Sequence, residues 1–74
     1  MANPMSEFCG AIERHIHDRT GRRVRNLAVE LFGESVVLRG RAATYHVKQL
    51  AQHGVKDLLP NAALVNNIIV EARN

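Results

Sequence analysis

The stretch LFGESVVLRGRA, residues 31–42, contains the strongest local structural signal in this chain. Gly33 and Glu34 interrupt an alternating apolar pattern, and placing them in a two-residue loop sets Leu31 opposite Val36. The apolar side chains of the two flanking segments then meet on one face, as the strict two-residue period of a strand requires. Glycine at the first loop position is typical of a type II′ turn. The stretch therefore predicts a β-hairpin.

A phosphate-binding loop is the alternative interpretation of Gly33 and Gly40, which bracket this stretch. Such a loop needs a helix that begins directly after the glycines, because the free N–H groups of its first turn bind the anion. A β-branched run follows Gly33 instead. We therefore predict strands over residues 24–31 and 35–42. In this register Val29 lies opposite Leu38 and Phe32 opposite Ser35, while Leu27, Val29 and Leu31 alternate along the first strand.

Amphipathic helices are predicted on both sides of the hairpin. The first covers residues 3–21, with Asn3 as its cap and Gly21 at its end. The second covers residues 43–59, with Thr44 as its cap. The expected apolar faces, read at a spacing of 3.6 residues, are Met5, Phe8, Cys9, Ile12 and Ile16 in the first helix and Val47, Leu50, Ala51, Gly54 and Leu58 in the second.

Residues 63–72, ALVNNIIVEA, predict a third strand after a turn at Pro60 and Asn61. The order helix, strand, strand, helix, strand predicts an α+β fold, a two-layer sandwich of a three-stranded sheet with two helices on one face. If the third strand pairs in parallel with the second, the second strand is central. Gly54 is expected to let the second helix approach the sheet closely. The whole chain, residues 1–74, is predicted to form a single domain.

The composition, 46% hydrophobic over 74 residues, is that of a folded domain with a thin core. No apolar run approaches the roughly 18 residues of a membrane span, and the first residues have no signal-peptide pattern. The expectation is a cytoplasmic protein if these residues are the full-length chain. The single cysteine, Cys9, excludes an internal disulfide.

The residue pattern contains no recognisable catalytic or metal-binding constellation. His15 and His17 are two residues apart, so on a helix they point in different directions. His46 and His53 are seven residues apart, about 10 Å along a helix axis, which is too far to share a metal ion. Cys9 lies on an apolar face, unlike an activated nucleophile. We therefore expect no metal, no cofactor and no enzymatic activity.

Positive charge is concentrated in one segment. The net charge is +3, and residues 14–25 alone contribute +4 from five arginines and one aspartate. Arg22, Arg23 and Arg25 follow the first helix and are candidates for binding phosphate groups of lipid or another anion. The alternative is an ordinary solvated loop.

The face of the sheet opposite the helices is a second candidate surface. If Val29, Leu38 and Ile68 face the helices, then Ala28, Val37, Val65 and Ile69 form the open face. Such a patch often marks a protein partner or self-association, although strands favour Val and Ile regardless of contact. Asn66 falls on the inner side, so it needs a hydrogen-bond partner there or a bulge that turns it outward.

Residues 24–70 resemble the BON domain, a small module of bacterial envelope proteins. The family pattern is a first strand, a glycine turn, a second strand that ends in Leu-x-Gly, an alanine-bearing helix, a Val-Pro-Gly-Val-like turn and a closing strand rich in Val and Asn. The matching segments are LAVELFG, VVLRGRA with Leu38 and Gly40, VKQLAQHGV with Ala51, LPNA at residues 59–62 and LVNNIIV at residues 64–70. Asn61 stands where the family usually has a turn glycine, and Asn also tolerates positive φ.

The resemblance implies a non-enzymatic attachment module that binds anionic phospholipid or another envelope component, and an envelope-associated location if the chain belongs to a longer protein. It assigns no catalytic or ligand-binding residue to a position in this chain. Nucleic-acid binding is not expected, because the chain has no Gly-x-x-Gly helix junction of the KH type and no aromatic residues placed along the strands to stack on bases.

Overall fold

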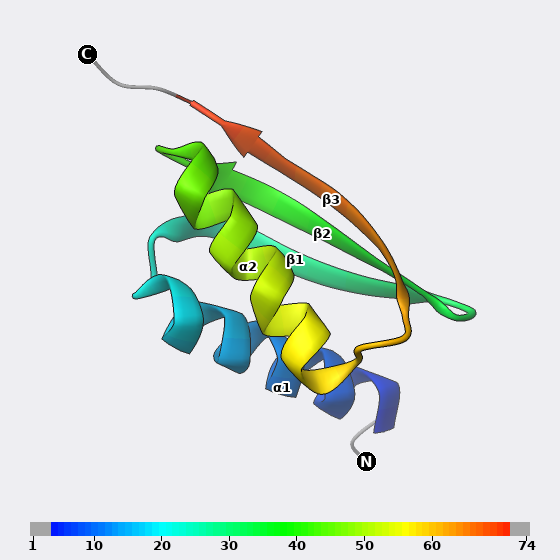
Figure 1. The fold of residues 1–74 in the computed structure, drawn as a ribbon. Coiled ribbons are helices and arrows are strands. Elements are labelled where there is room, and N and C mark those ends of the chain that lie inside the picture. Colours follow the sequence, from blue (N-terminus) through cyan, green and yellow to red (C-terminus); the bar gives the residue numbers. More distant parts are fainter. Residues whose placement is uncertain (1–3, 72–74) are drawn as a thin grey trace.

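The computed structural model describes residues 4–71, with side chains from Glu7 onward, and shows the predicted α+β sandwich (Figure 1). The elements are α1 (Pro4–Thr20), β1 (Val24–Phe32), β2 (Ser35–Ala42), α2 (Tyr45–Leu58) and β3 (Ala63–Val70). The two helices form one layer and the sheet forms the other. The proposed cap Asn3 and residue 72 of the predicted third strand lie outside the described residues.

The sheet has the order β1-β2-β3, so β2 is central as predicted. β1 and β2 are antiparallel, and β2 and β3 are parallel. The hairpin has the predicted register, with Leu31 opposite Val36 and Phe32 opposite Ser35. Gly33 has a φ of +60° and Glu34 does not share the positive φ, which is the combination of a type II′ turn.

A β-bulge in β1 is the feature of the sheet that the sequence pattern did not predict. The register shifts between Arg25 and Ala28, where Asn26 has a φ of +55°. Val24 and Val29 are five residues apart, so a regular strand would point them to opposite faces. The extra residue of the bulge turns both toward the helices, where both are buried. Leu27, expected in the inward row, is only half-buried.

The core lies between the two layers. It is built from one stripe on each helix and from the inner side chains of the sheet, namely Ile12, Ile16, Val24, Val29, Val36, Leu38, Ala42, Val47, Ala51, Val55 and Ile68. The apolar face predicted for α2 is therefore slightly rotated. Val55 is fully buried in the stripe that begins at Val47 and Ala51, whereas Leu58 remains 41% exposed. Phe8 of α1, also expected to face inward, is 40% exposed.

Gly54 is buried, but its close neighbour is α1 and not the sheet, so that part of the prediction was wrong. A Cβ atom on Gly54 would lie 3.3 Å from Cγ1 and 3.4 Å from Cα of Ile16. The helices cross at this point, and the missing side chain lets the α2 backbone rest on Ile16. The sequence identified the close approach but could not tell which neighbour was approached.

The Asn66 side chain faces the helices, where it forms two hydrogen bonds, and β3 has no bulge. Its Nδ2 donates to the carbonyl oxygen of Lys48 in α2 at 3.0 Å, and its Oδ1 accepts from the backbone N–H of Ile68 at 3.2 Å. A half-buried amide is therefore satisfied on both sides. This side chain ties the third strand to the second helix.

Candidate functional site

The turn between α1 and β1 places the three candidate arginines. Gly21 and Arg22 both have left-handed backbones, with φ values of +62° and +60°, and together they reverse the chain at the end of α1. The backbone N–H of Arg22 donates to the His17 carbonyl at 2.9 Å. Thr20 is fully buried and its Oγ1 donates to the Ile16 carbonyl at 2.8 Å, which anchors the turn to the helix.

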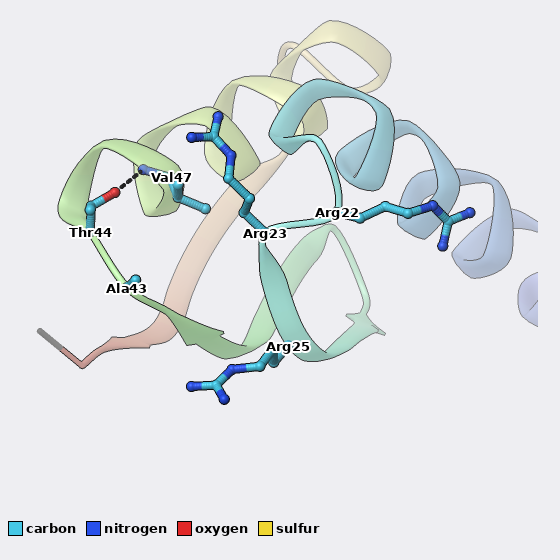
Figure 2. Close-up of a pocket in the computed structure, with 6 residues that line it drawn as sticks. All are labelled: Arg22, Arg23, Arg25, Ala43, Thr44 and Val47. Atoms are coloured by element: carbon cyan, nitrogen blue, oxygen red, sulfur yellow. Dashed lines mark hydrogen bonds between the residues drawn. The ribbon is translucent and has the colours of Figure 1, made fainter. Parts of the chain in front are cut away.

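The structure brings Arg22, Arg23 and Arg25 to the rim of one surface pocket of about 400 Å³. The other lining residues, Ala43, Thr44 and Val47, belong to the loop before α2 and to its first turn. Figure 2 shows that the three arginine side chains point in different directions. The Arg23 side chain extends beside the first turn of α2, and the Arg22 side chain points toward α1. The Arg25 side chain points away from both helices. Arg23 is partly fixed, because its Nε donates to the Thr20 carbonyl at 2.8 Å.

The charge at this end of the domain is not neutralised locally. Within residues 7–71, none of the three arginines forms an ion pair with a carboxylate. Arg41 adds a further positive charge directly opposite Arg25 on the neighbouring strand, and it pairs with Glu71 at 3.3 Å. The positive end of the α2 dipole also points here, because Thr44 caps this helix by accepting the Val47 N–H at 3.2 Å. The end as a whole is electropositive.

The Arg25–Arg41 pair predicts a measurable effect on stability. Like charges directly opposite in an antiparallel pair are destabilising. Arg25→Gln should therefore raise the free energy of unfolding slightly, by about 0.5 kcal/mol, in urea denaturation at low salt. Arg39→Gln is the matched control, because Arg39 pairs with Glu30 at 3.0 Å and its loss should not stabilise the fold. A lower stability for Arg25→Gln would contradict the unfavourable pairing.

The second candidate surface lies on the open face of the sheet. Val65 and Ile69 are 46% and 56% exposed on the edge strand β3, and Val37 is half-buried on β2, in register with Val65. Arg39 and Arg41 continue the same outward row of β2, in register with Asn67 and Ile69. The three predicted residues therefore share a face, but charged and amide side chains flank them.

A polar cluster between the two helices was not predicted. The Nε2 atom of His15 lies 2.9 Å from Oδ2 of Asp57, and Nε of Arg19 lies 3.2 Å from the same oxygen. The hydrogen bond from His15 and the nearby charge of Arg19 lower the pKa of Asp57. The cluster joins positions 42 residues apart, so no local pattern in the sequence reveals it.

The lowered pKa of Asp57 predicts how the cluster depends on pH. A carboxyl whose pKa is depressed by folding stabilises the folded state above its ordinary pKa, and this contribution is lost as pH falls through the folded-state value. Asp57→Asn should therefore be slightly less stable than the wild type at pH 7, with the difference disappearing in acid. Thermal unfolding of both proteins between pH 7 and pH 2 measures it. Asp18→Asn, which removes an exposed carboxylate of α1 outside this cluster, is the matched control.

The remaining reactive side chains show no metal-binding arrangement among the described residues. Cys9 is half-buried against the core. Between residues 7 and 71, no three His, Cys, Asp or Glu side chains gather closely enough to hold a metal ion. In the same part of the chain, no helix is long and apolar enough to cross a membrane.

Comparison of the chain with protein-family models, curated proteins and solved structures found no match.

Proposed function

We propose that this chain is a non-enzymatic binding module of the BON type, which attaches to anionic phospholipid through the end of the domain that carries Arg22, Arg23 and Arg25. The observation that supports the proposal most strongly is the spread of these three arginines around one pocket, without carboxylate partners among the described residues. Arginines without a carboxylate partner keep guanidinium N–H donors available to the phosphate oxygens of an external anion.

The diverging side chains favour an extended charged surface over a single small anion. A site for one phosphate group brings several donors toward one point, as the fork of a bidentate arginine does. Here Arg22, Arg23 and Arg25 extend in different directions. A membrane of anionic lipids offers many headgroups, and each arginine near it contributes about 1 kcal/mol. Three such contacts together correspond to an increase of about 150-fold in partitioning.

The residues that carry the BON resemblance have structural roles consistent with the family pattern. Leu38 is fully buried in the centre of the core, and Ala51 is buried in α2. Gly40 lies against the β1 bulge, where a Cβ atom would come within 3.0 Å of the Arg25 backbone oxygen. These roles support the assignment of the fold to that pattern. They do not involve the ligand, so the lipid part of the proposal depends on the arginines.

Replacing the three arginines tests the proposal. The triple variant Arg22→Gln, Arg23→Gln and Arg25→Gln should bind anionic vesicles about 100-fold more weakly than the wild type in co-sedimentation at low salt. Wild-type binding should rise with the fraction of phosphatidylglycerol in phosphatidylcholine vesicles and fall as salt is added, because exposed charges are screened within about 10 Å at 0.1 M.

The matched control removes the same charge from other surfaces, through Arg14→Gln, Arg39→Gln and Lys56→Gln. Both triple variants reduce the net charge from +3 to 0, so a difference between them reports position and not total charge. Equal weakening by the two variants would show non-specific attraction. Equal failure of the wild type to bind anionic and neutral vesicles would overturn the lipid proposal.

Protein interaction or self-association through the open face of the sheet is the second candidate function. The exposure of Val65 and Ile69 favours it, because exposed apolar residues that cluster on a monomer often mark an interface. It predicts that the double variant Val37→Lys and Ile69→Lys loses association while keeping the fold. A monomer of constant mass at all concentrations, with no partner, would argue against it.

A further inference from the structure

The two edges of the sheet differ in how well they are protected from pairing with another strand. An exposed edge presents unpaired backbone N–H and C=O groups, which proteins normally guard with bulges, prolines or charged residues. β1 carries the bulge at Asn26 and the charged residues Arg25 and Glu30. β3, ALVNNIIV, has eight residues without a proline or a charge, and its pairing with β2 is regular along its whole length.

The hydrogen bonds of β3 show which backbone groups face the free edge. Ala63 donates to the Glu34 carbonyl at 3.3 Å and Glu71 donates to the Ala42 carbonyl at 2.8 Å, so odd-numbered residues face β2. The backbone N–H and C=O groups of even-numbered residues point to the free edge of the sheet, because both groups of one residue point to the same side of a strand. The outward N–H of Ile68 accordingly has no strand partner and donates to the side chain of Asn66.

We propose that the free edge of β3 binds β3 of a second copy of this chain in antiparallel orientation, with Asn67 of one copy opposite Asn67 of the other. This pairing joins two three-stranded sheets into one continuous sheet of six strands. Because residues directly opposite in a sheet share a face, the helices of both copies lie on the same side. The inference concerns the edge of the sheet and does not depend on lipid attachment.

The sequence of β3 is what selects a second copy as the partner. On the open face of the sheet, opposite the helices, β3 carries the side chains of Val65, Asn67 and Ile69. One amide therefore lies between two exposed apolar side chains. Centred on Asn67, an antiparallel pair places Val65 of each copy opposite Ile69 of the other, and these side chains shield each other from water. The amides meet at the two-fold axis and can hydrogen-bond there. The same register places the outward backbone groups of Asn66 opposite those of Ile68, so that the ladder is complete.

Charge favours the antiparallel over the parallel orientation. Lys56 lies at the beginning of β3, where its Nζ donates to the Ala62 carbonyl at 3.1 Å, and Glu71 directly follows the end of the strand. Antiparallel pairing brings Lys56 of one copy next to the Arg41–Glu71 ion pair of the other, so the two Lys56 ammonium groups stay at opposite ends of the ladder. Parallel pairing would bring like charges together.

Asn66 limits the affinity of this contact. Its Oδ1 accepts from the same Ile68 N–H that the second copy needs, at 3.2 Å. Pairing therefore replaces one hydrogen bond of the Ile68 N–H by another. The binding free energy gained is smaller than it would be if this N–H had no partner in the monomer. Asn66→Ala removes the competitor on both copies and should tighten the dimer about tenfold, although it also removes the bond to Lys48 that stabilises the monomer.

Disulfide trapping tests the register directly. In a background of Cys9→Ala, Asn67→Cys places two thiols at a non-hydrogen-bonded pair, where Cα atoms are about 4.5 Å apart and a disulfide can close. Mild oxidation of the full chain should convert most of this variant into a covalent dimer. Val65→Cys, on the same face of the same strand, is the control and should crosslink poorly, because its counterpart is Ile69.

Two further variants distinguish association through the β3 edge from association through the open face of the sheet. Val70→Pro removes an outward N–H of the edge and should abolish association in sedimentation measurements, since proline is tolerated at a free edge. Val37→Lys changes only the open face and should leave association intact, with circular dichroism verifying both folds. Equal crosslinking of the two cysteine variants, or loss of association in Val37→Lys but not Val70→Pro, would overturn the edge contact. The second result would instead support the open face.

Discussion

Gly40→Ala is expected to lower the free energy of unfolding by about 3 kcal/mol. Gly40 has a φ of +156°, and a Cβ atom there would lie 2.9 Å from Cγ1 of Val24 and 3.0 Å from the backbone oxygen of Arg25. The second contact is with backbone, so relief requires the bulge itself to shift. Since domains of this size have unfolding free energies near the low end of about 5–15 kcal/mol, the variant should be substantially unfolded at modest urea concentrations.

Gly33→Asn is the control for this prediction. Gly33 also has a positive φ, +60°, but a Cβ atom there would meet nothing within 4 Å. Asn at this positive φ meets backbone strain of about 1 kcal/mol but no steric contact, so the loss should be smaller than that of Gly40→Ala. Similar midpoints for the two variants in urea denaturation would mean that the bulge does not constrain Gly40.

Gly54→Val is expected to be the second most damaging substitution, with a loss of about 2–4 kcal/mol. The side chain would enter the crossing of the two helices, where Cγ1 and Cα of Ile16 lie 3.3 Å and 3.4 Å from an ideal Cβ position. Two added methyl groups cannot fit there unless α1 and α2 separate, and separation exposes the core beneath them. Thermal unfolding should show a clear fall in melting temperature.

Gly10→Ala is the matched control on the other helix. A Cβ atom on Gly10 would meet only the Nη1 atom of Arg14, at 3.9 Å. The higher helix propensity of alanine should then stabilise α1 by up to about 1 kcal/mol. If Gly54→Val were as harmless as Gly10→Ala, the helices would not cross as described.

The hairpin could be predicted from sequence because its signals are local. The apolar rows on either side of Gly33 and Glu34 agree in only one register, and the turn type follows from the glycine. The bulge in β1 could not be predicted, because its cause is the need to bury both Val24 and Val29, which alternation alone places on opposite faces. The rotation of α2 that buries Val55 likewise depends on how the helix crosses α1.

The candidate site, like the fold, could be predicted where it depends on residues close in sequence and could not be predicted where it depends on long-range contacts. Arg22, Arg23 and Arg25 are close in sequence, so any compact turn brings them near one another. Their position beside the first turn of α2 depends on the long-range fold, as does the contact between His15 and Asp57. Pairwise contacts across the two helices arise from packing that no single segment encodes.

Locating the lipid contact on the wild-type protein tests the proposed attachment through the arginine turn. Backbone amide NMR spectra recorded with bicelles that contain phosphatidylglycerol should show shifts or broadening confined to the turn that carries Arg22, Arg23 and Arg25 and to the first turn of α2. The same bicelles without anionic lipid should leave these amides unchanged. Perturbation centred on Val65 and Ile69, or on the hairpin around Gly33, would contradict the assignment of the arginine end as the attachment site.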